Sequence, residues 1–428
     1  MIVYEADWVC PATVPSMRNA WVAVEGDRIA SVGTGPPPSN ARRATFAGCA
    51  ILPGFVNAHA HLELTLFQGL LENLTFADWI ARLVHIKYQR CTPDAFRVSA
   101  RLGAAQMIRA GVTAVGEVMD IGTGWDAMLE FGLQGVAYQE VFGPAETMAA
   151  EAMASLRVKV DRYRPQETAT QRLGISPHAP YTVSRKLYEE VRDYARGERL
   201  RMTSHVAESR EETAFVQDGA GPFAEAHRKR GIEVVARKCS PVEYLDRVRL
   251  LGADMLLAHA VEVDPHDLER IRETASFVVH CPRSNSYLRH RVAAVSEMRA
   301  RGIPVSLGTD SVASNESIDM FAEMRAVVEQ QTLSCDEAFR MATIEGARAL
   351  GMERDLGSLE SGKRADFSVV RIAESTEPVE EAVLRASVQD IVGTFLGGRE
   401  VRADVEELEE DVRRIQTKLR GQDDFHAR

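Results

Sequence analysis

The sequence predicts an α/β protein: a (β/α)8 TIM-like barrel with a small β-sandwich domain formed by both chain ends. Two observations predict the barrel. Short apolar runs alternate with longer, polar-faced helical segments, and eight such runs occur in the middle of the chain. Continuous apolar runs of this length fit strands that are covered on both faces. Paired strand patterns around turns near both ends predict the small domain.

The eight runs are spaced as alternating strands and helices require. Segments between them, such as 185–199 and 264–274, are rich in Glu, Arg and Leu at helical spacing. Eight βα units in about 300 residues fit a closed barrel better than an open sheet. The runs are 51–59, 113–118, 135–141, 173–176, 202–205, 255–259, 276–280 and 305–310.

The sequence patterns near the two chain ends differ from those in the middle of the chain. Residues 21–33 form a hairpin pattern with Gly-Asp at the turn, and 365–370 and 393–401 again resemble strands around a turn. The simplest assembly places both ends in one small domain. The predicted organisation is residues 1–53 and 357–403 for the small β domain, 54–356 for the barrel and 404–428 for a C-terminal amphipathic helix.

The C-terminal helix carries a narrow apolar seam. Its apolar residues follow spacings of 3, 4, 3 and 4, and two heptads are too short for an independent coiled coil. We therefore expect the helix to dock on the body of the protein, with pairing in a homodimer as the alternative. The seam consists of Val405, Leu408, Val412, Ile415 and Leu419.

Composition excludes several classes of function. The chain has 428 residues, 45% of them hydrophobic, and a formal charge of −11, which argues against a nucleic-acid-binding protein. No apolar stretch approaches the ~18 residues of a membrane span, so no membrane partner is expected. Six scattered cysteines without a C-x-x-C pair and an N-terminus without a signal-peptide pattern predict free thiols and a cytoplasmic protein.

Histidines gather at the carboxyl ends of the predicted strands. His59, His61, His205, His259 and His280 end strands or directly follow them, His178 follows the fourth run, and Asp310 ends the eighth. A single histidine is more often structural than functional. Barrel enzymes, however, build their sites at this rim, because strand ends converge there. The pattern therefore predicts a functional site.

Four of these side chains fit a catalytic metal centre. His59 and His61 alternate along one strand and point to the same face. With His205 and Asp310 they give three nitrogen ligands and one oxygen ligand, with room for water. Such a site holds one divalent metal ion; zinc is favoured, and iron suits the same ligands. The ion would lower the pKa of its water from about 15.7 to near 7.

These motifs resemble the amidohydrolase superfamily, in the branch of chlorohydrolases and cytosine-, adenosine- and guanine-type deaminases. The similarity covers essentially the whole barrel and extends to the flanking segments 26–29 and 357–366. The motifs are PGFVNAHAHLE at 53–63, HVAE at 205–208, LAH at 257–259, HCPRSN at 280–285 and GTDS at 308–311.

The resemblance implies roles for individual residues. Glu208 would shuttle protons to a ring nitrogen and the leaving amine, and His259 would orient the water and stabilise the developing oxyanion. Asp310 would bind the metal and accept the proton of the water. The fourth strand contains no lysine that could bridge two metals, so one metal is expected. Glu208 could instead be a rim carboxylate paired with Arg210.

Substrate-contacting residues are less sharply defined. His178 resembles a substrate-contacting residue of nucleoside-type deaminases, and Glu140, Arg283 and Asn285 also face the expected pocket. Each could instead stabilise a loop by hydrogen bonding, and His280 is expected to shape its loop. The apolar segment 63–79 would either wall the pocket or form a core helix.

Three short stretches look most like aminodeoxyfutalosine deaminases, enzymes of the futalosine route to menaquinone. They are 59–65, 77–80 and 138–143. The small-molecule substrate of such enzymes carries a benzoate, which Arg283 or Arg289 could bind. Adenosine, S-adenosylhomocysteine or methylthioadenosine deamination is the nearest alternative, followed by dechlorination of a related heterocycle. A non-catalytic barrel scaffold is the remaining one.

Overall fold

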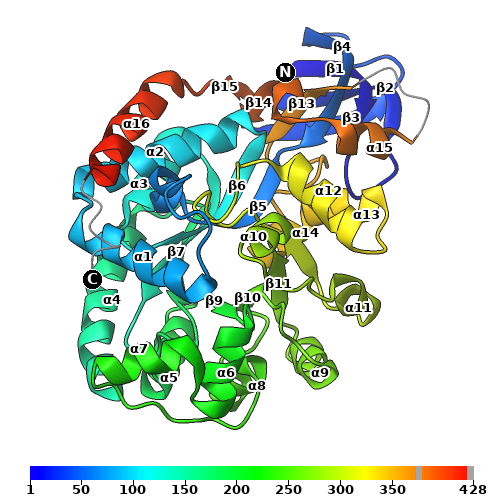
Figure 1. Cartoon of the computed structure of the whole chain (residues 1–428). Coiled ribbons are helices and arrows are strands. Elements are labelled where there is room, and N and C mark those ends of the chain that lie inside the picture. Colours follow the sequence, from blue (N-terminus) through cyan, green and yellow to red (C-terminus); the bar gives the residue numbers. More distant parts are fainter. Residues whose placement is uncertain (373–377, 422–428) are drawn as a thin grey trace.

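The computed structural model describes residues 1–372 and 378–421, and it contains a large barrel and a smaller sheet (Figure 1). Within these described residues, eight parallel strands pair in the order β12-β11-β10-β9-β8-β7-β6-β5. The predicted barrel is confirmed. Its strands are β5 (Phe55–Ala60), β6 (Val112–Met119), β7 (Gln134–Val141), β8 (Gln171–Pro177), β9 (Arg201–Val206), β10 (Met255–His259), β11 (Phe277–His280) and β12 (Val305–Leu307).

The first of the eight predicted strands, residues 51–59, spans parts of two strands in the structure. Strand β4 (Arg42–Pro53) belongs to the smaller sheet, and β5 begins only after Gly54. A Cβ atom on Gly54 would lie 2.0 Å from the Thr113 hydroxyl oxygen, so only glycine fits at this junction. The apolar run is continuous because both strands are buried there, and burial alone does not mark the boundary.

The barrel closes between its first and last strands through few but well-defined contacts. The Asp310 backbone N–H donates to the His59 carbonyl oxygen at 2.9 Å. Deeper in the barrel, Asn57 Nδ2 donates to Thr309 Oγ1 at 2.7 Å, and Asn57 Oδ1 accepts from the Thr309 backbone N–H at 3.0 Å. These bonds fix the carboxyl ends of β5 and β12 against each other.

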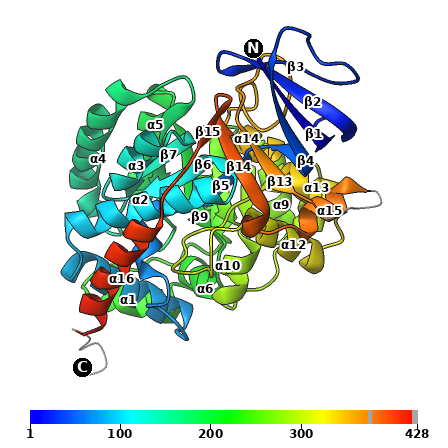
Figure 2. The ribbon, with the colours of Figure 1, turned by 90° about the horizontal axis from the view of Figure 1, so that it is seen from above.

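Helices flank the barrel on its outer side (Figures 1 and 2). No helix in the described ranges is both long and apolar enough to cross a membrane. The helices are α1 (Phe76–Gln89), α2 (Pro93–Arg109), α3 (Thr123–Phe131), α4 (Ala149–Tyr163), α5 (Arg185–Gly197), α6 (Arg210–Asp218), α7 (Gly221–Lys229), α8 (Pro241–Arg247), α9 (Pro265–Glu273), α10 (Pro282–Tyr287), α11 (Val295–Ala300), α12 (Met320–Gln330), α13 (Cys335–Met341), α14 (Ile344–Ala349), α15 (Val379–Arg385) and α16 (Glu406–Arg420), with short 3-10 turns η1 (Leu62–Phe67), η2 (Glu146–Met148), η3 (Arg164–Gln166) and η4 (Val388–Asp390).

Both chain ends form the smaller sheet, as predicted. Tyr4 on the N-terminal strand lies 5.3 Å from Phe395, ring to ring, and donates to the Gly398 carbonyl oxygen, although two strands separate them in the sheet. The sheet therefore folds over its own apolar core. Counted over the described residues, its seven strands pair in the order β15-β14-β13-β4-β1-β2-β3, with β1 (Ile2–Val9), β2 (Met17–Glu25), β3 (Arg28–Thr34), β13 (Phe367–Arg371), β14 (Ile391–Leu396) and β15 (Arg399–Val401).

The C-terminal helix α16 lies along α2 (Figures 1 and 2). Its seam residues Leu408, Val412 and Leu419 are buried. Gln416 Nε2 donates to the carbonyl oxygens of Leu66 and Gln68 at 2.9 and 3.0 Å. This arrangement agrees with the expected docking on the body. The tail beyond residue 421 lies outside the described residues.

The apolar segment 63–79 contributes both to the protein core and to the wall of a cavity, the two alternatives expected from its sequence. Leu66 and Phe67 in η1 are fully buried core residues. Leu64, Phe76 and Trp79 line the large cavity at the carboxyl ends of the barrel strands. The segment therefore links the protein core to the wall of the cavity.

Asn57→Ala should test how much the barrel depends on its closure. The substitution removes two buried hydrogen bonds and leaves the Thr309 N–H without its partner. We expect the free energy of unfolding to fall by about 2–4 kcal/mol, measured by urea denaturation followed by tryptophan fluorescence. The exposed Asn40→Ala is the matched control. A loss below about 0.5 kcal/mol in Asn57→Ala would contradict this role.

Candidate active site

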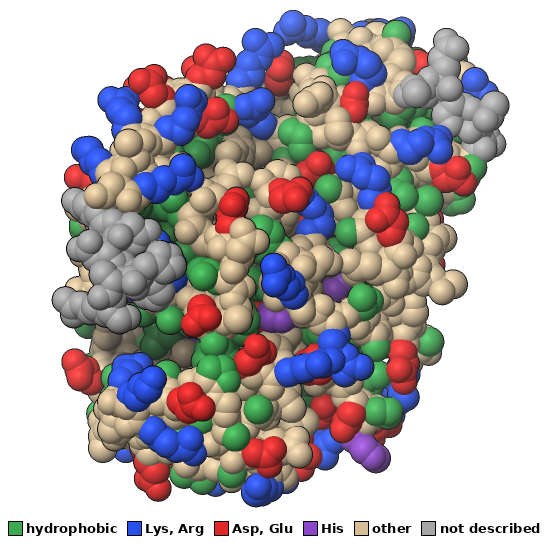
Figure 3. Space-filling model, viewed as in Figure 1, with side chains coloured by type: hydrophobic (Ala, Val, Ile, Leu, Met, Phe, Trp, Pro, Cys, Tyr) green, Lys and Arg blue, Asp and Glu red, His purple; other side chains and the backbone are tan. Residues whose placement is uncertain are grey.

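A cavity of about 290 Å³ opens at the carboxyl ends of the barrel strands. Histidine side chains are visible near the centre of this face in Figure 3. One wall is apolar and comes largely from α1, whereas polar side chains from the strand ends form the rest. Its polar and charged lining residues are His61, Lys87, Tyr88, Glu140, His178, Tyr181, Thr182, His205, Glu208, His227, Arg230, His259, Asp310 and Ser311.

Three predicted ligands meet where the barrel closes. The Nε2 atoms of His59 and His61 lie 3.6 and 3.5 Å from Asp310 Oδ1. Asp310 adopts a left-handed backbone conformation with φ of 58°, which a non-glycine residue adopts only at a cost. Its other oxygen, Oδ2, accepts hydrogen bonds from Ser284 Oγ at 2.7 Å and Ser314 Oγ at 2.8 Å. The two serines therefore leave Oδ1 directed at the histidines.

The fourth predicted ligand, His205, reaches the same cluster from β9. Its Nε2 atom lies 3.3 Å from His61 Nε2. The Nδ1–H group donates to the His178 carbonyl oxygen at 3.0 Å, so Nε2 carries the lone pair that a metal requires. Burial and the neighbouring His59 and His259 lower the pKa of His205 to about 4, which keeps the ring neutral at neutral pH.

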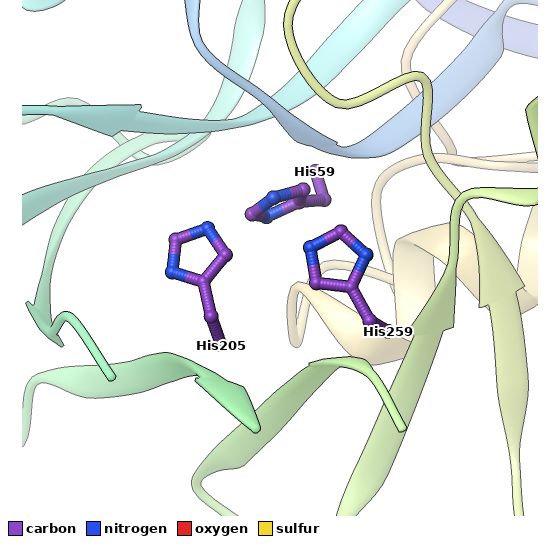
Figure 4. A group of neighbouring side chains, drawn as sticks. All are labelled: His59, His205 and His259. Atoms are coloured by element: carbon purple, nitrogen blue, oxygen red, sulfur yellow. The ribbon is translucent and has the colours of Figure 1, made fainter. Parts of the chain in front are cut away.

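His259 approaches from β10 and faces His59 and His205 (Figure 4). Its ring lies 5.5 Å from that of His59, and its φ of 73° is again left-handed. The Nδ1–H group donates to Asn285 Oδ1 at 3.0 Å, which leaves Nε2 as an acceptor on the cavity side. Burial, the largest effect, lowers the pKa of His259.

The cluster fits a divalent metal ion. Both ring nitrogens of His59 are buried without a hydrogen-bond partner among the described residues, which is rare for polar atoms unless a ligand satisfies them. Candidate ligand atoms lie within 4.8 Å of one another in two sets that share His59: one with His61 and Asp310, the other with His205 and His259. Neutral imidazoles with one carboxylate suit zinc or iron.

Glu208 lies beside His259 in the cavity. Its Oε1 atom is 3.8 Å from His259 Nε2 and 3.5 Å from His290 Nε2. Burial opposes ionisation of Glu208, but these two histidines outweigh it and lower the pKa of the carboxyl group. Glu212 accepts hydrogen bonds from the backbone N–H groups of Ala207 and Glu208.

The expected alternative for Glu208, a salt bridge with Arg210, is not what the structure shows. Arg210 lies 3.8 Å from Glu262 instead. Glu208 is therefore held by its own backbone and the neighbouring histidines.

Glu140 and His178 lie on the other side of His205. His178 Nδ1 lies 2.8 Å from Thr182 Oγ1, and its Nε2 lies 3.8 Å from Glu140 Oε1. Burial raises the pKa of Glu140 to about 8, although Lys87 opposes this shift. Both residues line the cavity, as expected for groups that contact a substrate.

Arg283 and Asn285 occupy different positions from those expected. Neither lines the cavity. Arg283 bonds to the Ser317 carbonyl oxygen at 3.2 Å and pairs with Glu316 and Glu323. Asn285 lies behind His259 and contacts it directly. The structure therefore gives both residues supporting roles instead of the expected contacts with substrate. The prediction was wrong because the local sequence does not determine in which direction a side chain on a helical turn points.

Arg289 and His280 are also set back from the cavity. Arg289 lines a separate hollow. His280 Nδ1 lies 3.4 Å from Asn285 Nδ2, and burial lowers the pKa of His280 to about 3. His280 thus supports the side chain that orients His259, in keeping with its expected role in shaping the loop.

Several contributors were not predicted from the sequence. Ser284, Ser314 and Glu212 support other site residues, His290 contacts Glu208, and Arg230 lines the cavity. None of them ends a strand, so the strand-end rule could not identify them. A signal was present only for Ser284, which lies inside the HCPRSN motif.

Comparisons with known proteins agree with this geometry. The 5-methylthioadenosine/S-adenosylhomocysteine deaminase of Syntrophobacter fumaroxidans is 30% identical over 93% of this chain and 92% of its own. The aminodeoxyfutalosine deaminase of Deinococcus radiodurans is 35% identical over 71% of this chain and 74% of its own. An adenosine deaminase from Xanthomonas campestris, solved with bound zinc, has a TM-score of 0.84 at 24% identity and covers 98% of both chains, which shows the same fold.

A family model, the Amidohydrolase family, matches residues 50–401, from the last strand before the barrel to the end of the small sheet. The match takes in the barrel and every strand-end residue described above. The chain belongs to the amidohydrolase family.

Proposed function

We propose that the protein is a metal-dependent hydrolytic deaminase of an amino-substituted N-heterocycle carried by a nucleoside. One observation carries the proposal: Glu208 and His259 face each other at 3.8 Å in the cavity that also holds the cluster of His61, His205 and Asp310. A proton-transfer pair next to a metal-binding cluster suits hydrolysis of a C–N bond.

Each side chain has a distinct task in this proposal. His59, His61, His205 and Asp310 would hold the ion, which supplies hydroxide at neutral pH. Glu208, which its lowered pKa keeps ionised, would take the proton that the attacking water releases and deliver it to the ring nitrogen beside the carbon under attack. It would then carry the remaining hydroxyl proton to the departing amine, which leaves as ammonia. The unprotonated Nε2 of His259 would accept a hydrogen bond from the nucleophile and orient it.

The lining of the cavity combines the apolar and polar surfaces that a nucleoside requires. Phe76, Trp79 and Leu83 provide an apolar wall that excludes water and covers a flat base. His178 and Glu140 also line the cavity and supply polar contacts. Lys87 is tied to Asp120 at 2.9 Å and so is not free to bind a substrate anion.

Aminodeoxyfutalosine is the proposed substrate, which would place the enzyme in menaquinone biosynthesis in the cytoplasm. The likeness to the Deinococcus radiodurans enzyme supports this choice. The benzoate of this substrate needs a cation, and Arg230 lines the cavity without a salt bridge in the described part of the chain. Arg230 therefore takes the role expected of Arg283 or Arg289.

Methylthioadenosine, S-adenosylhomocysteine or another adenine nucleoside is the second candidate. The likeness to the Syntrophobacter fumaroxidans deaminase over almost the entire chain favours it. All of these substrates share the adenine amine, so the same proton transfers would serve each of them.

Ammonia release from a panel of substrates tests the reaction and ranks the substrates. The panel contains aminodeoxyfutalosine, adenosine, S-adenosylhomocysteine, methylthioadenosine, guanine and cytosine. We expect fastest turnover of aminodeoxyfutalosine, with about one zinc or iron ion per chain by elemental analysis. No ammonia from any member, with metal bound, would refute the deaminase proposal.

Glu208→Gln should separate proton transfer from metal binding. The amide keeps the shape of the side chain but cannot carry the proton, so we expect kcat to fall about 10²- to 10⁴-fold with metal content unchanged. His205→Ala is the comparison variant and should lose both metal and activity. Full activity of Glu208→Gln would exclude it as the proton shuttle.

Arg230→Gln should distinguish an acidic substrate from a neutral one. We expect KM for aminodeoxyfutalosine to rise about fivefold, as befits an exposed ion pair, and KM for adenosine to stay unchanged. Lys229→Gln removes the neighbouring exposed charge, which does not line the cavity, and serves as the control. Equal effects of Arg230→Gln on both substrates would contradict carboxylate binding at this position.

A further inference from the structure

One short segment, residues 284–290, contacts three different groups of the candidate site. Ser284 Oγ donates to Asp310 Oδ2 at 2.7 Å. Asn285 Oδ1 accepts from His259 Nδ1 at 3.0 Å, and His290 Nε2 lies 3.5 Å from Glu208 Oε1. The end of α10 and the residues that directly follow it thus reach a proposed metal ligand and both members of the proposed proton-transfer pair.

The segment is firmly attached to the body of the protein. The backbone N–H of Arg283 donates to Glu323 Oε2 at 3.2 Å, while Glu323 Oε1 accepts from Asn315 Nδ2 at 2.8 Å. Within the segment, the backbone N–H of His290 donates to the Asn285 carbonyl oxygen at 2.8 Å. The positions of Asn285 and His290 are therefore coupled through the main chain.

The side chain of His290 points at Glu208 from a largely apolar surrounding. Its Nε2 atom is buried and has no well-formed hydrogen bond within residues 1–372 and 378–421. The imidazole ring packs edge-on against Phe76, with ring centres 4.8 Å apart. Buried polar nitrogens need a partner, and the nearby Glu208 carboxylate is the acceptor that the geometry offers.

The two histidine contacts of Glu208 also fall on the same oxygen. His259 Nε2 and His290 Nε2 both approach Oε1, at 3.8 and 3.5 Å. Fixing Oε1 would leave Oε2 free to carry the proton that moves to and from the substrate.

We propose that His290 is a positioning residue for Glu208, whose Nε2–H group holds Oε1 and so directs Oε2 toward the substrate. The catalytic meaning of this contact rests on the proposed deaminase function. The contact itself does not, because it is a property of the folded chain. The competing explanation is that His290 only packs against Phe76 and fills space.

Two substitutions at this position distinguish positioning from packing. His290→Leu keeps apolar contact with Phe76 but removes the donor, whereas His290→Gln keeps an N–H group near the position of Nε2. The exposed His266→Leu is the matched control for loss of a histidine. All variants are assayed as metal-loaded, full-length proteins, with metal content measured.

With the substrate that the wild type turns over fastest, we expect His290→Leu to lower kcat about 10- to 100-fold, the effect of one charge-assisted hydrogen bond. KM should change less than twofold, and metal content should not change. His290→Gln should recover kcat to within about fivefold of the wild type. Equal losses in both variants, or a change in KM alone, would overturn the positioning role.

A measurement without turnover tests the contact separately. The measurement is an NMR spectrum of protein with ¹⁵N-labelled histidine, in which the Nε2 resonance of His290 is assigned by its loss in His290→Gln. We expect this nitrogen to be protonated and its chemical shift to change in Glu208→Gln. An unchanged signal would overturn the contact even if the enzyme is active. Absence of ammonia from the wild type, with the shift present, would refute the proposed function and leave the contact standing.

Discussion

The candidate site depends on the closure of the barrel between β5 and β12. The hydrogen bonds between Asn57 and Thr309 join residues 252 positions apart in the sequence, and the Asp310 N–H bond to the His59 carbonyl oxygen lies beside them. They set the distance between the His59 ring and the Asp310 carboxylate. Because Asp310 also has a left-handed backbone, its carboxylate turns inward at the strand end. Closure of the barrel therefore also brings together two of the side chains proposed to bind the metal ion.

Control of histidine tautomers is a second theme of the site. His205 donates its Nδ1–H to a carbonyl oxygen, and His259 donates its own to an amide oxygen. Both rings thus present an unprotonated Nε2 to the centre of the site (Figure 4). Burial favours the neutral form of each ring. These hydrogen bonds fix the orientation of both rings in advance, which would reduce the cost of reorganisation when an ion or a substrate binds.

The sequence allowed the barrel and the strand-end residues to be predicted because burial and periodicity are local properties. The runs at 113–118 and 135–141, for example, lie entirely within buried strands. It failed for Arg283 and Asn285, whose side chains are directed by partners on distant segments, Glu323 and His259. His290 carried no signal at all, since it follows a helical turn and its partner Glu208 lies 82 positions earlier.

The docking of α16 has a consequence for biosynthesis of the chain. Gln416 donates hydrogen bonds to the carbonyl oxygens of Leu66 and Gln68, in and just after η1, which directly follows His61. Leu66 and Gln416 are 350 positions apart in the sequence. A chain emerging from the ribosome presents His59 and His61 long before Gln416, so this segment gains its support only after about 350 further residues have been made. The hydrogen bonds that α16 gives to the first loop of the barrel therefore form later in synthesis than the loop itself.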